Sequence, residues 1–211
     1  YGLTKGQYSP TTPMNKVTKS SPHGTIEHPF NIGELVMGAQ GTFFARIPDN
    51  DLTQMTEAMF EAAKHDGTSI IEMLQNCIIF ADKAHFGIIS KENRDENMCI
   101  IKDGQPILFG ADKQKGLRLN GTNLEVVELG KDGITIDDIL VHDRYDPNPG
   151  IHIMLAKLGP PHFPRVFGVI RSAMFPTYDD LVEEKIRLGI EESPIKKMDH
   201  LFKSGETWEI K

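Results

Sequence analysis

The sequence has few of the features that mark membrane proteins and secreted proteins. No apolar run approaches the ~20 residues that span a bilayer, and the longest runs, such as residues 77–81, have the length of a strand. The chain has only two cysteines, Cys77 and Cys99, and no basic-then-apolar signal segment opens it. We therefore exclude membrane insertion and a disulfide-stapled secreted module, and we expect a cytoplasmic protein.

Several common catalytic and binding motifs are also missing. The eight histidines occur without the HxH or HExxH spacing of zinc sites, and neither a GxSxG elbow nor a Walker loop is present. The net charge of −7 disfavours binding to nucleic acid or an anionic membrane, because both attract basic surfaces. We interpret His142-Asp143 and Asp146-Pro147 as turn residues and not as a catalytic dyad.

The first part of the chain combines a long loop with an alternation of helices and strands. Residues 1–31 are rich in Pro, Gly, Ser and Thr, which predicts a long ordered loop or a disordered arm. The chain opens on turn-forming residues without a leading strand or helix, so we expect a piece of a longer chain. The elements predicted next are a helix that Asn31 caps and Gly41 ends, a strand over 42–47, a helix over 49–65 capped by Asn50 or Asp51, and a strand over 68–74 that is buried on both faces. This order is half of a wound α/β sheet.

The predicted helix over 49–65 has the apolar spacing of an amphipathic helix. The residues that recur at this spacing are Leu52, Met55, Met59, Phe60 and Ala63. The elements predicted after residue 80 are a hairpin over 100–109 that turns at Asp103-Gly104, two short strands around Asn120-Gly121, a helix over 151–158, a strand over 166–170 and a helix over 178–189 that Thr177 caps. The tail after these elements is polar.

Two features indicate chemistry. In residues 1–7, the glycines let the backbone approach a ligand closely, while the Thr4 hydroxyl and the Lys5 charge suit an anion. Cys77 follows the second predicted strand in the sequence Gln75-Asn76-Cys77. It is either a small buried hydrophobe or one ligand of an iron–sulfur cluster whose other thiolates lie elsewhere.

Together these features resemble the β subunit of 2-oxoacid:ferredoxin oxidoreductases, thiamine-diphosphate enzymes that decarboxylate a 2-oxoacid and pass electrons to ferredoxin. The resemblance extends over the whole chain, through YGLTKGQYSPTT (1–12), KVTKSSPHG (16–24), PFN (29–31), QNC (75–77), VHD and DPNP (141–149), FPRVFGVIR (163–171), PTYDDL (176–181) and SGETW (204–208). The version with TKG after YGL is similar to the 2-oxoglutarate branch, and the long KVTKSSP loop agrees with it.

The resemblance implies an α/β fold made of two parts. Residues 1–81 match the C-terminal part of a thiamine-diphosphate-binding parallel-sheet domain, and residues 82–211 match a C-terminal extension of the β subunit. In this family a GDG sequence and a later Asn hold the Mg²⁺ that binds the cofactor diphosphate, and three cluster cysteines lie earlier still. None of these is in the sequence. We expect such a fragment to be inactive alone, to expose a sheet edge and to be poorly soluble.

Few site residues carry over from the family. Gly2 and Leu3 match positions whose backbone lies against thiamine diphosphate, and Thr4 is expected to bond a phosphate oxygen. Cys77 matches the fourth thiolate of the [4Fe–4S] cluster, whereas Cys99 matches nothing in the family and is interpreted as structural. The IIFAD sequence after QNC departs mildly from the IFND-like sequence of the relatives. No side chain is assigned as a catalytic acid or base.

Lys5 bears on the identity of the substrate. The second carboxylate of 2-oxoglutarate requires a cation if it is buried, because an unpaired buried charge costs several kcal/mol. Lys5 stands where relatives have the smaller Gly, so it supplies this cation and disfavours pyruvate. The alternative is that Lys5 points to solvent. Lys16 and Lys19 are weaker candidates for the same role.

The resemblance implies a β subunit that uses thiamine diphosphate, Mg²⁺ and a [4Fe–4S] cluster to decarboxylate 2-oxoglutarate oxidatively. Coenzyme A takes the acyl group to give succinyl-CoA and CO₂, and ferredoxin takes the electrons. The other implied partner is the α subunit, which supplies the other half of the cofactor site. Two alternatives stay open: the same chemistry on pyruvate or a branched-chain 2-oxoacid, and a non-enzymatic α/β interaction module.

Overall fold

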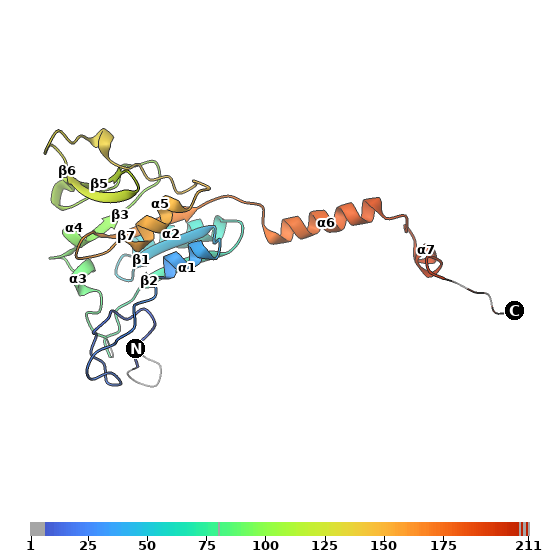
Figure 1. Ribbon diagram of the computed structural model, residues 1–211, viewed down its shortest axis with the longest axis horizontal. Coiled ribbons are helices and arrows are strands. Elements are labelled where there is room, and N and C mark those ends of the chain that lie inside the picture. The colour runs from blue at the N-terminus through green and yellow to red at the C-terminus, as the bar shows by residue number, and fades with distance from the viewer. Residues whose placement is uncertain (1–6, 80, 207, 209, 211) are drawn as a thin grey trace. The chain divides into compact units, whose positions relative to one another are not determined.

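A computed structural model (Figure 1) describes residues 7–79, 81–206, 208 and 210. The predicted site residues Gly2, Leu3, Thr4 and Lys5 lie outside the described residues. The helices are α1 (Ile32–Gly38), α2 (Leu52–Lys64), α3 (Phe86–Ile89), α4 (Arg94–Asn97), α5 (Gly150–Lys157), α6 (Tyr178–Glu192) and α7 (Met198–Phe202). The strands are β1 (Phe43–Pro48), β2 (Ser69–Leu74), β3 (Met98–Ile100), β4 (Leu108–Phe109), β5 (Lys115–Asn120), β6 (Asn123–Glu128) and β7 (Arg165–Ser172).

The chain divides into two compact units, Tyr1–Met174 and Phe175–Lys211. The first unit holds both sheets, and the second holds α6 and α7. In the described part of the chain, no helix is both long and apolar enough to cross a membrane.

The main sheet has four strands in the order β2-β1-β7-β3. β1 and β2 are parallel, with Phe43 opposite Ser69 and Pro48 opposite Leu74, whereas β7 runs antiparallel to β1 and parallel to β3. The expected α/β fold is therefore confirmed, with β7 making the sheet mixed. The carboxyl ends of β1 and β2 lie at the same edge.

Helices cover both faces of this sheet, because alternate side chains of β1 point to opposite sides. Phe43, Ala45 and Ile47 pack with Ala58 of α2 on one face. On the other face, Phe44 packs with buried residues of α1 and α5. The helices approach closely there, since a Cβ added at Gly33 would lie 2.7 Å from the Cβ of Ala156 and 2.9 Å from the Phe44 ring.

A second sheet, β4-β5-β6, is antiparallel. The predicted turn at Asn120-Gly121 joins β5 to β6, which confirms that strand pair. The hairpin predicted over 100–109 is wrong, because β3 pairs with β7 and β4 pairs with β5. The backbone after the Asp103-Gly104 turn hydrogen-bonds to residues 140–142 instead.

The helix α2 begins where predicted, with the Asp51 carboxylate accepting a hydrogen bond from the Gln54 N–H. Met55 of this helix packs against the core, but Leu52 and Phe60 do not and are 74% and 62% exposed. The small side chain of Ala58 is buried against β1 instead. The prediction that the second strand is buried on both faces is also wrong, because β2 is an edge strand and most of its residues are only half-buried.

A buried ion pair joins β1 to β2. The Arg46 guanidinium is fully buried, and its Nε donates to Glu72 Oε2 at 2.6 Å. Its Nη2 donates to the Ala156 carbonyl of α5 at 3.0 Å, and the guanidinium carbon lies 5.7 Å from the centre of the Phe44 ring. One charged side chain therefore links two strands and a helix.

Removing the carboxylate of this pair is expected to destabilise the fold. In Glu72→Gln the guanidinium stays buried without a counter-ion, and we expect the free energy of unfolding to fall by about 3 kcal/mol. The matched control is Glu128→Gln, which removes an exposed ion pair with Lys131 and should change the free energy by less than about 0.5 kcal/mol. Urea denaturation of both variants measures the difference, and equal losses would contradict the prediction.

Two buried histidines and an arginine form a second polar cluster in the core. His152 Nε2 donates to the Asp143 carbonyl at 2.8 Å, and its Nδ1 lies 2.9 Å from Arg171 Nη1. Because a guanidinium can only donate, Nδ1 accepts and His152 is neutral. His142 Nε2 donates to the Val169 carbonyl at 3.0 Å. Burial is the main cause that lowers the pKa of both histidines.

The turn interpretation of this segment is confirmed for its aspartates and wrong for His142. The Asp143 carboxylate accepts from the Tyr145 N–H at 2.9 Å, and the Asp146 carboxylate accepts from the Asn148 N–H at 2.8 Å. His142 instead belongs to the core, because its side chain is completely buried.

The lowered pKa values make stability depend on pH. Below the unfolded histidine pKa of about 6.5, the unfolded state binds more protons than the folded state, so the free energy of unfolding falls as the pH falls. In His152→Gln the slope of this fall should decrease, because one such group is gone. The control His162→Gln changes an exposed histidine and should leave the slope unchanged. Denaturant titrations from about pH 8 to about pH 5 test this, and an unchanged slope in His152→Gln would disprove it.

Candidate functional site

The candidate site lies at the edge where the parallel strands β1 and β2 end. Asp49 follows β1 directly, and the predicted Gln75-Asn76-Cys77 sequence follows β2. The carboxyl ends of parallel strands are where ligands commonly bind in α/β folds. Each residue at this edge is positioned by the loop that leaves its strand.

A hydrogen-bonded clamp ties the two strand ends together. The Asp49 N–H donates to the Leu74 carbonyl at 3.2 Å, and the Asn76 N–H donates to Asp49 Oδ2 at 2.8 Å. The backbone immediately before Cys77 is thereby fixed to the end of β1. Sequence reasoning missed this clamp, although an Asp after one strand and an Asn after the next was a usable signal.

The Asn76 side chain also holds the chain that follows Cys77. Its Oδ1 accepts from the Lys83 N–H at 2.8 Å, and its Nδ2 donates to Asp82 Oδ1 at 3.1 Å. The Cys77 carbonyl accepts from the Ala81 N–H at 2.8 Å. The loop around Cys77 is therefore fixed on both sides of the thiol.

The two cysteines occupy different environments. Cys77 is half-buried in this fixed loop, whereas Cys99 is completely buried in β3, with its Sγ 3.6 Å from the Leu108 carbonyl. Burial raises the pKa of the Cys99 thiol to about 12, so it stays protonated and is a poor metal ligand. The structural role predicted for Cys99 is confirmed.

Cys77 fits an iron–sulfur cluster as one ligand among several. Thiolate sulfur is the usual ligand of such clusters, and four thiolates are the usual number. Among the residues that the structure describes, no group of three or more His, Cys, Asp or Glu side chains is placed to hold a metal ion. Any cluster bound at Cys77 must therefore take its other ligands from elsewhere.

A cavity of about 530 Å³ lies beside the clamp. Its lining includes Asp49, Asn76, Lys83, His85 and Phe86. Burial lowers the pKa of His85, and the nearby Arg165 lowers it further. At neutral pH, this wall of the cavity therefore carries a neutral imidazole, which the sequence did not indicate.

The described part of the N-terminal segment is an ordered loop, which was one of the two forms predicted. Thr25 is buried and its hydroxyl donates to the Pro13 carbonyl at 2.8 Å, while the Phe30 N–H donates to the Pro10 carbonyl at 2.7 Å. The Tyr8 hydroxyl donates to the Glu27 carboxylate at 2.6 Å, which raises the pKa of Tyr8 and lowers that of Glu27. The weaker substrate candidates in this loop, Lys16 and Lys19, are both exposed.

A family model described as the C-terminal TPP-binding domain of thiamine pyrophosphate enzymes matches residues 1–73. The matched range includes the N-terminal loop, β1, α2 and most of β2. The match therefore includes the parallel strand pair that leads to the candidate site, and it ends just before the loop of Cys77.

Curated relatives extend the similarity further along the chain. The 2-oxoglutarate oxidoreductase subunit KorB of Mycobacterium tuberculosis is 37% identical over all of this chain, which covers 56% of that protein. The 2-oxoglutarate synthase subunit KorB of Archaeoglobus fulgidus is 40% identical over 36% of this chain and 29% of its own length. The chain thus spans about half of the M. tuberculosis subunit.

A solved structure has a similar fold. The 2-oxoglutarate:ferredoxin oxidoreductase of Magnetococcus marinus, with 2-oxoglutarate, coenzyme A and succinyl-CoA bound, matches 98% of this chain and 55% of its own chain, with a TM-score of 0.64 and 19% identity. The resemblance that the motifs predict is confirmed along the whole chain, which is similar to the β subunits (KorB) of 2-oxoglutarate:ferredoxin oxidoreductases.

Proposed function

We propose that this chain is part of the β subunit of a 2-oxoglutarate:ferredoxin oxidoreductase. With its α subunit, the enzyme converts 2-oxoglutarate and coenzyme A to succinyl-CoA and CO₂, and two electrons pass to ferredoxin. The proposal is carried by one observation: the 37% identity with the M. tuberculosis KorB subunit covers the whole chain, including the clamped loop of Cys77. The name of the M. marinus relative gives the same substrate.

Thiamine diphosphate, bound with Mg²⁺, supplies the means of stabilising negative charge during decarboxylation. In this proposal Gly2 and Leu3 place backbone against that cofactor, and the Thr4 hydroxyl donates to a phosphate oxygen. Lys5 provides the cation for the second carboxylate of 2-oxoglutarate, because a buried carboxylate without a partner is costly. The residues that bind Mg²⁺ belong to the part of the subunit outside this chain.

Cys77 is proposed to be one thiolate ligand of the [4Fe–4S] cluster that passes electrons to ferredoxin. The hydrogen bonds of Asp49 and Asn76 support this role, since they fix the backbone before and after the cysteine. A ligand held in this way loses little conformational freedom when it binds a metal. The other three thiolates come from the rest of the enzyme.

Replacing Cys77 is expected to remove the cluster. A complex of the full-length Cys77→Ser subunit with the α subunit should lose most of its cluster iron and the low-temperature EPR signal of the reduced cluster. Cys99→Ala is the matched control, because Cys99 is buried in β3 and should leave both readouts unchanged. If Cys77→Ser retains iron and signal as the control does, Cys77 is not a ligand.

The substrate assignment is tested at Lys5. In Lys5→Met the cation for the second carboxylate is lost, and kcat/KM for 2-oxoglutarate should fall by roughly 100-fold, corresponding to about 3 kcal/mol. The value for pyruvate should hold or rise, because its methyl group no longer faces a charge. Lys64→Met, at an exposed lysine of α2, is the control and should change neither.

Anaerobic assays with a low-potential viologen as electron acceptor give both constants for each variant. An equal fall in kcat/KM for both substrates would mean that Lys5 does not recognise the second carboxylate of 2-oxoglutarate. If the wild-type enzyme turned over pyruvate or a branched-chain 2-oxoacid faster than 2-oxoglutarate, that acid would replace 2-oxoglutarate as the proposed substrate.

A further inference from the structure

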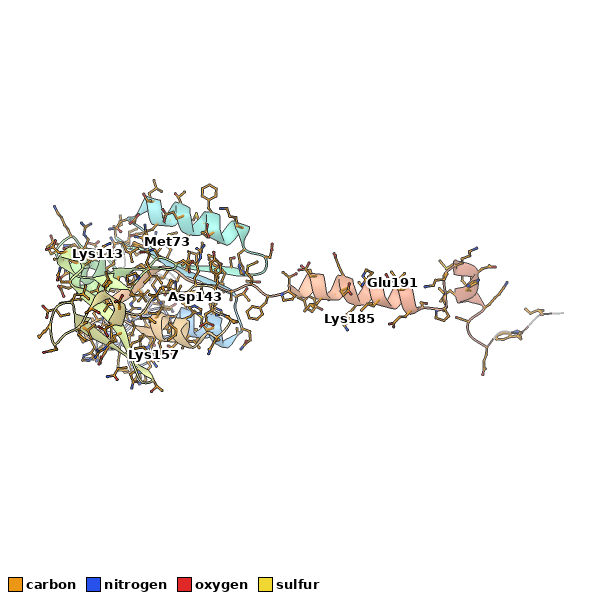
Figure 2. The ribbon with its side chains drawn as sticks, turned by 90° about the horizontal axis from the view of Figure 1, so that it is seen from above. Met73, Lys113, Asp143, Lys157, Lys185 and Glu191 are labelled. Atoms are coloured by element: carbon orange, nitrogen blue, oxygen red, sulfur yellow. The ribbon has the colours of Figure 1, made fainter. Side chains whose placement is uncertain are left out.

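Two isoleucines that directly follow Cys77 are exposed. Ile78 and Ile79 are each 77% exposed, although isoleucine is among the residues most often buried in folded proteins. Both follow β2, the edge strand of the main sheet, on which Figure 2 marks Met73. Among the described strands, none pairs with the outer edge of β2. This isoleucine pair is therefore an apolar surface that is open to another segment of protein.

Hydrogen bonds hold the turn that carries the isoleucine pair. The Cys77 carbonyl accepts from the Ala81 N–H at 2.8 Å, which closes the turn around Ile78 and Ile79. Ala81 itself is buried, and the Asn76 amide oxygen accepts from the Lys83 N–H at 2.8 Å. The residues on both sides are thus anchored, so the turn presents the two isoleucines outward beside the thiol.

The role proposed for Cys77 decides which segment meets this surface. A [4Fe–4S] cluster is a compact cube that four thiolates hold, so the segment with the other three thiolates must approach Cys77 closely. Ile78 follows Cys77 directly, with about 3.8 Å between their Cα atoms. The isoleucine pair is therefore within reach of the approaching segment and of the cluster itself.

An apolar surface at this place changes the chemistry of a bound cluster by excluding water. The apolar shell around a metal site controls solvent access and, through it, the reduction potential. Reduction adds negative charge to a cluster whose thiolate ligands are already negative, and water stabilises that charge. Excluding water therefore lowers the reduction potential, and it also slows the loss of the cluster to oxygen and water.

We propose that Ile78 and Ile79 pack against the segment that carries the other three thiolates and so seal the cluster from water. This proposal rests on the proposed function, which makes Cys77 a cluster ligand. Neither isoleucine has a group that binds iron. The pair instead sets the environment in which Cys77 binds it.

The test compares variants of the full-length β subunit in complex with the α subunit, purified without oxygen. Ile78→Thr combined with Ile79→Thr keeps β-branched side chains in the turn but brings two hydroxyl groups to the seal. On exposure to air, the rate at which the cluster absorbance bleaches should rise roughly tenfold, because each buried methylene contributes about a factor of four.

Two controls separate a seal from a general effect on the fold. Ile78→Val combined with Ile79→Val keeps the surface apolar and should bleach as slowly as the wild type. Ile26→Thr combined with Ile136→Thr changes two exposed isoleucines elsewhere in the chain and should also leave the rate unchanged. Far-UV circular dichroism of each variant checks that the fold is intact.

The reduction potential provides a second readout. In an EPR-monitored titration with dithionite, the potential of the double Ile→Thr variant at 78 and 79 should shift upward, because water then stabilises the reduced cluster. If this variant is purified without iron while the Val variant keeps its cluster, the seal is lost entirely, and Ile79→Thr alone supplies the potential.

The proposal requires both changes, so a bleaching rate or a potential that stays at the wild-type value would overturn it. Wild-type values of both, together with a raised KM for ferredoxin, would instead place the isoleucine pair on the surface that binds ferredoxin.

The outcomes for the seal and for the function are separate. A complex that loses its cluster faster in the double Ile→Thr variant but oxidises no 2-oxoacid would remove the proposed reaction and keep the seal. An active complex whose cluster is equally stable in all variants would keep the reaction and remove the seal. A wild-type complex without iron would remove both.

Discussion

The ion pair between Arg46 and Glu72 fixes the register on which the candidate site depends. The two residues lie directly opposite each other in the parallel pair of β1 and β2. A slip of one residue would turn Glu72 to the other face of the sheet and leave a buried guanidinium without its counter-ion. The same register brings Pro48 level with Leu74, so that Asp49 reaches the backbone of the loop that carries Cys77. A contact in the core thus sets the position of the thiol at the edge.

Features whose physical causes are local were predictable from the sequence. The caps at Asn31, Asp51 and Thr177 each bond a backbone N–H three residues further on, so the signal and the structure lie in the same short segment. The hairpin prediction over 100–109 failed because the actual hydrogen-bond partner is distant in the sequence. The Ile107 N–H donates to the Leu140 carbonyl, and no pattern near residue 107 predicts that contact. In α2, too, a distant partner decides: β1 is contacted by Ala58 and Met55, whereas Leu52 and Phe60 stay exposed.

At the site, the sequence indicated the thiol but not the groups that hold it. Cys77 follows a predicted strand, and that placement is confirmed. Asp49 and Asn76 are 27 residues apart, and their contact appears only when β1 and β2 pair in the observed register. The pKa of His85 is lowered by burial and by Arg165, which is 80 positions away. The sequence around residue 85 therefore could not predict a neutral imidazole. Gly2, Leu3, Thr4 and Lys5 stay predictions, because they rest on the family resemblance.

The proposed function explains why this chain presents a single positioned thiolate. Cys77 provides one thiolate, whereas a [4Fe–4S] cluster usually takes four. In the proposed enzyme this ligand set is incomplete without other parts of the protein, so assembly would stabilise the cluster by mass action. A ligand set completed by assembly ties cluster binding to the presence of the whole enzyme. On this argument, the hydrogen bonds of Asp49 and Asn76 hold the thiolate in place for a cluster whose other ligands the rest of the enzyme supplies.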